Sequence, residues 1–140
     1  MHISIKKENR LEFKIGPSDS PIIDYDNYKI TFSPNNYSRV WFYVVNPEFE
    51  YSYKDVKIYL SFIDSKPIEI KVTNIDQDKF WNEFEKGQYS AWIREIGPRE
   101  ALRTPSLEFQ FKEKGKYYFI CTMNADGYKP VTYEKHFIVK

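Results

Sequence analysis

Ser106–Lys140, SLEFQFKEKGKYYFICTMNADGYKPVTYEKHFIVK, predicts three consecutive antiparallel strands separated by turn-forming residues. In the first strand, Leu107, Phe109 and Phe111 alternate with polar residues, which is typical of a strand with one buried face. The second strand, Tyr117–Met123, is apolar on both faces, so we expect it to lie in the middle of a sheet. This stretch predicts an all-β fold.

The same two-residue alternation recurs along the rest of the chain. It predicts one or two short edge strands within residues 3–15, and further strands at 28–32, 40–45, 56–62, 68–72 and 131–139. The run VWFYVV at residues 40–45 is apolar throughout and short, so we expect it to be buried on both faces. Short strands with frequent turn signals are typical of a sandwich. We therefore expect an antiparallel two-sheet, immunoglobulin-like sandwich of seven to nine strands, with a single domain over residues 1–140.

One short helix is expected near residues 75–86. Phe84 lies four residues after Phe80 and three after Trp81, which places the three rings on one helical face. Gly87 is well placed to end such a helix. We expect the helix to pack over an open edge of the sandwich.

Residues 88–105 are harder to assign. A strand is one interpretation of residues 89–96, and residues 99–104 are expected to form a loop. For the core, the alternation predicts five large buried side chains: Trp41, Val44, Leu60, Phe109 and Phe119.

The charge balance gives no electrostatic reason to expect nucleic acid or membrane insertion. The 21 basic and 20 acidic residues leave a formal net charge of +1. No apolar run reaches transmembrane length, and the N-terminal residues lack the apolar core of a signal peptide. One cysteine, Cys121, excludes an intrachain disulfide. These features fit a cytoplasmic protein and an excised domain of an exported microbial protein equally well.

No catalytic or cofactor-binding constellation stands out. His2 and His136 are the only histidines, and neither lies near a recognisable nucleophile. Asp19, Asp24 and Asp26 could attract calcium, but they lack the spacing of a calcium-binding loop. We therefore predict no catalytic residues, no metal site and no cofactor, and we expect the protein not to be an enzyme.

Two short stretches resemble β-sandwich families. Glu113-Lys-Gly-Lys-Tyr117-Tyr-Phe119 resembles the tyrosine corner of immunoglobulin-like domains, which implies that the Tyr117 hydroxyl bonds back to the upstream backbone. Phe119 stands where that family has its second cysteine, so the inter-sheet disulfide is absent. Residues 45–47 and 55–60 are similar to the B–C hairpin of CARDB-type adhesion modules, found in archaeal and bacterial surface proteins. At most, the two resemblances imply an adhesion or spacer role.

Aromatic loop residues are the candidate binding site. In an immunoglobulin-like sandwich the B–C and F–G loops emerge at the same end. The first would carry Phe49, Tyr51 and Tyr53, and the second Asp126 and Tyr128. Tyrosine suits binding because it combines a large rigid ring with a polar tip. The alternative is that these rings fold back and cap the core.

Three hypotheses for function follow. The first is a non-catalytic interaction, adhesion or spacer module, and the second is a carbohydrate-binding module that uses exposed aromatics. The third is an enzyme or an accessory domain of one. The partner is accordingly expected to be a protein or a carbohydrate. A linear platform of Trp or Tyr on a sheet face would favour the second hypothesis.

Overall fold

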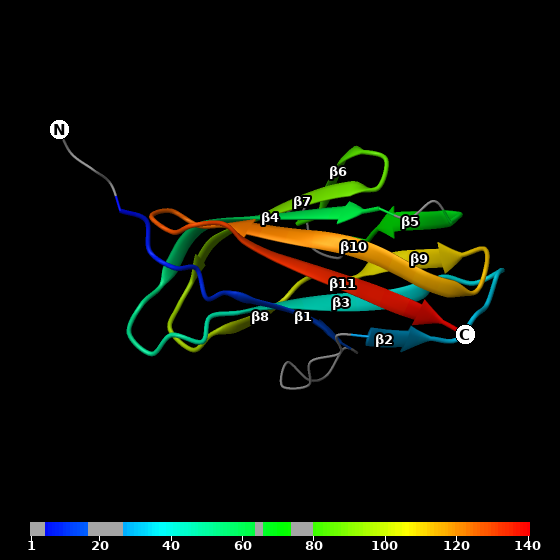
Figure 1. Cartoon of the computed structure of the whole chain (residues 1–140), viewed down its shortest axis with the longest axis horizontal. Helices are drawn as coiled ribbons and strands as arrows, with labels where there is room; N and C mark the ends of the chain where they lie inside the picture. Colours follow the sequence, from blue (N-terminus) through cyan, green and yellow to red (C-terminus); the bar gives the residue numbers. More distant parts are fainter. Residues whose placement is uncertain (1–4, 17–26, 64–65, 74–79) are drawn as a thin grey trace.

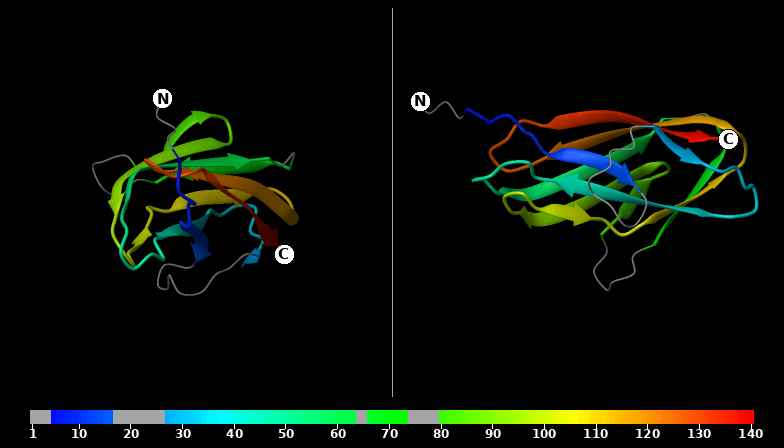
Figure 2. Two further views of the ribbon diagram at one scale, coloured as in Figure 1. Left: turned by 60° about the vertical axis from the view of Figure 1, so that its left-hand side comes forward. Right: turned by 90° about the horizontal axis from the view of Figure 1, so that it is seen from below.

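The chain forms two β-sheets, seen as two layers in Figures 1 and 2. The computed structural model describes residues 5–16, 27–63, 66–73 and 80–140. This part of the chain contains no helix, and it forms eleven strands rather than the seven to nine predicted. The strands are β1 (Glu12–Gly16), β2 (Asn27–Ile30), β3 (Ser38–Val45), β4 (Tyr53–Phe62), β5 (Ile68–Val72), β6 (Asn82–Glu85), β7 (Gln88–Ile96), β8 (Ala101–Arg103), β9 (Leu107–Phe111), β10 (Gly115–Asn124) and β11 (Val131–Val139).

One sheet has the order β1-β3-β9-β5, with β8 paired to β3 as well. The other has the order β2-β11-β10-β4-β7-β6. Neighbouring strands run antiparallel, except that β2 lies parallel to β11. The all-β, two-sheet prediction is confirmed.

The C-terminal stretch is distributed over both sheets. β9 belongs to the five-stranded sheet, whereas β10 and β11 pair with each other in the six-stranded sheet. The prediction of three consecutive paired strands is therefore wrong at its first turn, where the chain crosses between the sheets. At this crossing the Tyr117 hydroxyl donates a hydrogen bond to the Glu113 carbonyl oxygen at 2.6 Å, which is the predicted back-bond.

β10 is central, as predicted, because β4 and β11 flank it. It is not buried on both faces. Tyr117, Phe119, Cys121 and Met123 point into the sandwich, whereas Tyr118 on the opposite face is exposed. The outer face of this sheet lacks a covering layer in the described part of the chain, so its apolar residues remain in contact with solvent.

Aromatic rings fill the core between the sheets. The ring of Phe119 lies 5.0 Å from that of Phe62, 5.3 Å from Phe137 and 6.0 Å from Phe42, measured between centroids. Four of the five predicted core residues are fully buried, namely Val44, Leu60, Phe109 and Phe119.

Trp41 is the exception among the predicted core residues. It is only half-buried, because it points to the outer side of β3 and its partner on β1 is Gly16, which has no side chain to cover it. Tyr43 on the same outer side is buried. On the outer side of the run at residues 40–45, the prediction of burial is therefore correct for Tyr43 and wrong for Trp41 and Val45, which are only partly buried.

The helix predicted near residues 75–86 is not supported. Residues 75–79 lie outside the described part of the chain, and residues 82–85 form β6, which pairs with β7 across Lys86 and Gly87. Gly87 has a φ of +77°, which suits a tight hairpin as well as a helix end. Trp81 is still buried, and its indole N–H donates to the Pro105 carbonyl oxygen at 3.0 Å.

The tentative strand at residues 89–96 is confirmed as β7. The loop expected at residues 99–104 instead contains β8, which pairs with the C-terminal half of β3. Three residues are too few to show an alternation, so the sequence pattern could not reveal this strand.

Candidate functional site

Three segments meet at one end of the sandwich, on the left in Figure 1. They are the β3–β4 loop (residues 46–52), the β10–β11 loop (residues 125–130) and the N-terminal segment that precedes β1. Lys7 joins the last two, because its N–H donates to the Gly127 carbonyl oxygen at 3.0 Å and its carbonyl accepts from the Lys129 N–H at 2.8 Å. The expectation that the two loops lie at the same end is confirmed, and we call this region the loop end.

Asn46 fixes the shape of the β3–β4 loop. Its buried side-chain amide donates to the carbonyl oxygens of Tyr51 at 2.8 Å, Ile96 at 3.2 Å and Gly97 at 2.9 Å. Its side-chain oxygen accepts from the Glu48 N–H at 2.9 Å. One buried side chain thus ties this loop to the end of β7.

Tyr53 is not a loop residue. It is the first residue of β4 and is fully buried, so it cannot contact a partner directly. Its hydroxyl accepts from the Arg10 N–H at 2.9 Å, and its ring lies 4.2 Å from that of Tyr128. Burial raises the pKa of Tyr53, and the Arg10 N–H opposes this rise. For Tyr53 the capping alternative is correct.

Phe49 and Tyr51 are exposed at the loop end, by 78% and 52% respectively. The Lys7 ammonium lies 4.9 Å from the centre of the Tyr51 ring, and the Arg99 guanidinium lies 4.6 Å from that of Phe49. Both rings are therefore held by a cation from another segment, although one face of each remains open to a partner.

A shallow hollow of about 310 Å³ lies beside these rings. Its lining consists of Lys7, Glu8, Arg10, Glu48, Tyr51 and Tyr128. The charged lining residues balance: two are basic and two are acidic. Arg10 pairs with Glu48 at 3.6 Å and Lys129 with Glu8 at 3.0 Å, so the hollow offers no excess charge to an ionic ligand.

The sequence missed the four charged members of this lining. They lie in the N-terminal segment and at the start of the β3–β4 loop, and a local pattern could not show that they approach the β10–β11 loop. Asp126, which the sequence did predict, is exposed beside this hollow but does not line it. Its N–H donates to the Lys54 carbonyl oxygen at 3.0 Å, which ties the β10–β11 loop to β4.

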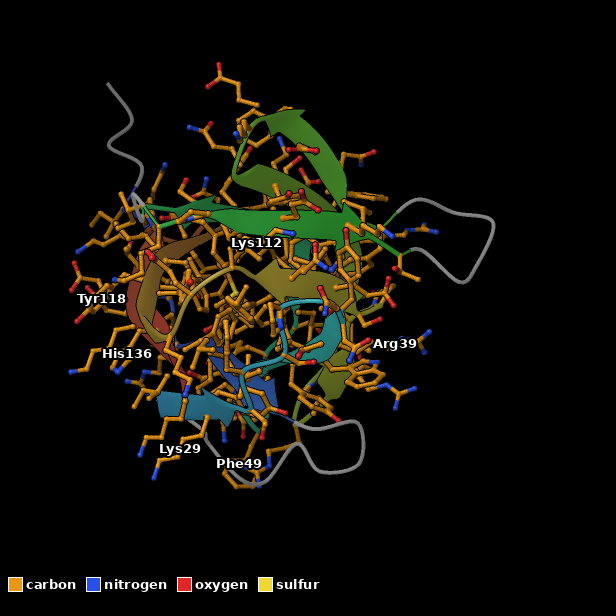
Figure 3. The ribbon with its side chains drawn as sticks, turned by 90° about the vertical axis from the view of Figure 1, so that its right-hand side faces the viewer. Lys29, Arg39, Phe49, Lys112, Tyr118 and His136 are labelled. Carbon is orange, nitrogen blue, oxygen red and sulfur yellow. The ribbon has the colours of Figure 1, made fainter. Side chains whose placement is uncertain are left out.

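A second group of exposed aromatics lies on the outer face of the six-stranded sheet. Trp92 on β7 is 55% exposed, Tyr59 on β4 is 37% exposed and Tyr118 on β10 is 46% exposed. Trp92 is opposite Lys57, two residues before Tyr59, so Trp92 and Tyr59 are diagonal neighbours whose backbones lie about 7–8 Å apart. Tyr118 packs against His136 across the β10–β11 pair at 5.2 Å, and Figure 3 shows these two side chains next to each other.

Trp92 is held in place by a hydrogen bond. Its indole N–H donates to a carboxylate oxygen of Asp55 on the neighbouring strand. A ring fixed in this way loses little conformational freedom when a ligand stacks on it.

The remaining titratable groups offer little chemistry. Burial raises the pKa of the Cys121 thiol well above its usual value, which keeps this side chain protonated and unreactive. Asp19, Asp24 and Asp26 lie outside the described residues. Within the described residues no three His, Cys, Asp or Glu side chains gather as a metal site would require. No helix in that part of the chain is long and apolar enough to span a membrane.

Comparisons with known proteins give distant structural similarity. No protein-family model matches the chain, and no curated protein matches it either. Among solved structures, the chain is similar to one named BspA_C_WT, with 12% identity, a TM-score of 0.45, and coverage of 92% of this chain and 50% of that one.

Two further solved structures show likenesses of the same kind. AvmM, which catalyses macrocyclization in alchivemycin A biosynthesis, has 12% identity and a TM-score of 0.43 over 96% of this chain and 95% of its own. A family 123 glycoside hydrolase from Clostridium perfringens has 14% identity and a TM-score of 0.40 over 93% of this chain and 27% of its own.

Proposed function

We propose that the chain is a non-catalytic binding module with immunoglobulin-like topology, and that it contacts its partner through the loop end. The observation that supports this most is the pair of exposed rings, Phe49 and Tyr51, on a loop fixed by a buried Asn46. Large aromatic rings on a rigid support are frequent contact residues in binding loops.

The strand order supports the immunoglobulin-like part of this proposal. The order β1-β3-β9-β5 matches the A-B-E-D sheet of such domains, and β11-β10-β4 matches the G-F-C strands of the other sheet. The Tyr117 back-bond occupies the position of the tyrosine corner. The β6–β7 hairpin is a departure, because it lies beside β4 in space but follows β5 in the sequence.

The nature of the loop end favours a protein partner. Its hollow is shallow and its charges are balanced, whereas Phe49 and Tyr51 protrude. Protruding aromatics beside paired charges resemble the apolar centre and polar rim of protein–protein interfaces. We therefore propose that this binding module serves an adhesion or spacer role.

A photo-crosslinking experiment tests the loop end. Benzoylphenylalanine replaces Tyr51 in one variant and Phe84 in a control, because Phe84 is comparably exposed but lies on β6. We expect irradiation in the source cells to give a discrete crosslinked product at position 51 that Phe49→Ser abolishes. If position 51 gives no product, or gives the same products as position 84, the loop end is not the contact surface.

A second candidate function is carbohydrate binding, and one observation favours it. Trp92 and Tyr59 are neighbouring exposed rings on a sheet face, on which the apolar faces of sugar rings could stack. Tyr118 is exposed on the same face further along, opposite Ile63, so the surface would suit an extended oligosaccharide rather than a single sugar.

An oligosaccharide array separates the two candidates. If the sheet face binds carbohydrate, the protein should be retained on specific oligosaccharides of the array. Trp92→Ala and Tyr59→Ala should abolish this retention, whereas Phe49→Ser combined with Tyr51→Ser should leave it unchanged. Absence of retention on a broad array of plant, fungal and bacterial oligosaccharides would eliminate the carbohydrate candidate.

A further inference from the structure

In the part of the chain that the structure describes, the sandwich is open along one side, between β5 and the β6–β7 hairpin. A groove of about 780 Å³ lies there, which is within the range of ligand-binding clefts. Its apolar lining comes from both sheets and includes Phe62, Ile68, Ile70, Tyr89 and Tyr117. The inward-facing side chains of β5 remain only half-buried because the groove leaves them uncovered.

Among the described residues β5 is an edge strand, and the side of it that they leave free can be derived from its pairing with β9. The Lys112 N–H donates to the Pro67 carbonyl oxygen, and the register continues as Ile68 opposite Phe111 and Glu69 opposite Gln110. In an antiparallel ladder, hydrogen-bonded pairs alternate with pairs that are not bonded. Glu69 therefore points its backbone groups toward β9.

The three alternate residues of β5 have their backbone groups on its other side. Ile68, Ile70 and Val72 are the non-bonded positions, so their N–H and C=O groups point away from β9 along the edge of the sheet. Unpaired edge groups of this kind are a template for another strand. The same three residues direct their side chains to the inner side, where the groove begins.

The charges around the groove favour an acidic occupant. Four lysines line it, and only two carboxylates do: Lys66, Lys71, Lys86 and Lys112 against Glu69 and Glu83. Figure 3 labels Lys112 on this side of the molecule.

Both carboxylates already interact with neighbouring groups. Glu69 accepts from the Tyr37 hydroxyl at 3.0 Å and lies 4.0 Å from the Lys112 ammonium. Glu83 hydrogen-bonds the Tyr89 hydroxyl. Lys66 and Lys71 have neutral partners: the Lys66 ammonium donates to the Lys116 carbonyl oxygen at 3.0 Å, and the Lys71 ammonium lies 4.0 Å from the centre of the Tyr37 ring. The lining therefore keeps an excess of positive charge.

We propose that β5 binds an extended, acidic segment of a partner protein, which adds to the five-stranded sheet as a new edge strand. Its backbone would bond to Ile68, Ile70 and Val72, and alternate apolar side chains would enter the groove against Phe62 and Tyr89. Its acidic side chains would face the lysines at the rim. Main-chain bonds provide affinity in this mode of recognition, and the pockets for alternate side chains provide specificity. This site is separate from the loop end and does not depend on the function proposed there.

Amide hydrogen exchange tests the proposal residue by residue. The probe is a short acetylated peptide in which Glu and Val alternate, and the control peptide has Lys in place of Glu. In the free protein, the amides of Ile68, Ile70 and Val72 should exchange faster than those of Glu69 and Lys71. Saturating acidic peptide should slow the first three by at least about tenfold and leave the other two little changed. The basic peptide should have no such effect.

Two protein variants complete the test. Ile70→Pro removes an N–H on the free side and leaves the β5–β9 bonds intact, so it should abolish peptide binding. Lys71→Glu combined with Lys86→Glu should weaken acidic-peptide binding at least about tenfold at low ionic strength, because the attraction between opposite charges is lost. Lys57→Glu, on the outer face of the six-stranded sheet, is the matched control and should bind normally.

The outcomes decide the proposal. It is overturned if Ile68, Ile70 and Val72 are as protected as their neighbours in the free protein. It is equally overturned if the acidic peptide at millimolar concentration leaves their exchange unchanged, or if the double charge reversal binds as tightly as the Lys57→Glu control.

Discussion

Asn46→Ala tests how the loop end is built. The change removes one side chain that bridges the β3–β4 loop to the end of β7 and leaves the backbone N–H of residue 46 bonded to the Glu100 carbonyl oxygen. Three carbonyl oxygens lose this donor, although the Gly97 oxygen still accepts from the Glu100 N–H at 3.1 Å, and the Glu48 N–H loses its acceptor. No other side chain at this end of the sandwich makes as many hydrogen bonds among the described residues.

The expected loss of stability follows from these four bonds. The bond to the Ile96 carbonyl is fully buried, so its loss leaves an unsatisfied group that costs about 1–3 kcal/mol. The other three bonds are partly exposed, and water can replace part of each, so each contributes about 0.5–1 kcal/mol. The amide group has only two hydrogens, so two of the three carbonyl oxygens share one of them, and the four contacts count as about three bonds. Their sum is about 2–5 kcal/mol, which is a large share of the total stability of a small domain.

Urea unfolding followed by tryptophan fluorescence measures this change. The matched control is Asn36→Ala, because Asn36 is exposed in a turn and its side chain donates to the exposed Ser33 hydroxyl oxygen at 2.8 Å. We expect the control to change the free energy of unfolding by less than about 0.5 kcal/mol. A loss below about 1 kcal/mol for Asn46→Ala would refute the argument that this side chain organises the loop end.

Three further predictions concern the core. Phe119→Ala should lower the free energy of unfolding by about 3–5 kcal/mol, because removing a fully buried ring leaves a cavity. Denaturant titration measures this change, and a loss below about 1 kcal/mol would contradict the packing described. Tyr117→Phe should cost about 1–2 kcal/mol in the same assay through the lost bond to the Glu113 carbonyl, whereas an unchanged midpoint would show that the corner bond is dispensable. Burial first, and Glu83 second, raise the pKa of Tyr89 above the value of 10.0 for a free tyrosine. The unfolded chain therefore ionises first, so stability should fall as the pH rises above about 10, and Tyr89→Phe should show a smaller fall across that range in pH-dependent melting curves.

The sequence predicted the sheets better than their connections. The two-residue alternation that indicates a strand is a local property, so it revealed β4, β9 and β11 directly. Whether β9 pairs with β10 depends on which sheet each one joins, and a short turn is compatible with both arrangements. The crossing became visible only through the pairing of β9 with β3 and β5.

The helix error shows how one residue pattern can serve two structures. The spacing of Phe80, Trp81 and Phe84 suits a helical face, and Gly87 suits its end. In the structure Trp81 turns into the core while Phe84 is exposed, and Gly87 forms the tight turn between β6 and β7. Pairing with a partner strand overrode the local periodicity, as tertiary context often does.

The candidate site was only partly predictable for a related reason. The sequence identified aromatic residues in two loops but could not show whether each ring faces solvent or core. Tyr53 and Tyr51 differ by two positions, yet one is fully buried and the other half-exposed. The difference arises because β4 begins at Tyr53, where Arg10 and Tyr128 from distant parts of the chain cover the ring.

The high aromatic content is therefore weak support for binding until the rings are placed. The chain has 12 Tyr, 11 Phe and 3 Trp, and ring contacts such as those of Phe119 account for many of them as core. What needs an explanation is an exposed ring without a polar group. Phe49 is the strongest case, because it is 78% exposed and gains only one cation contact, from Arg99, in return. Serine at this position would avoid the exposed apolar surface at little cost to the loop, which Asn46 fixes through other atoms. The most economical explanation of Phe49 is that a partner covers it, and this is why the crosslinking test is centred on its loop.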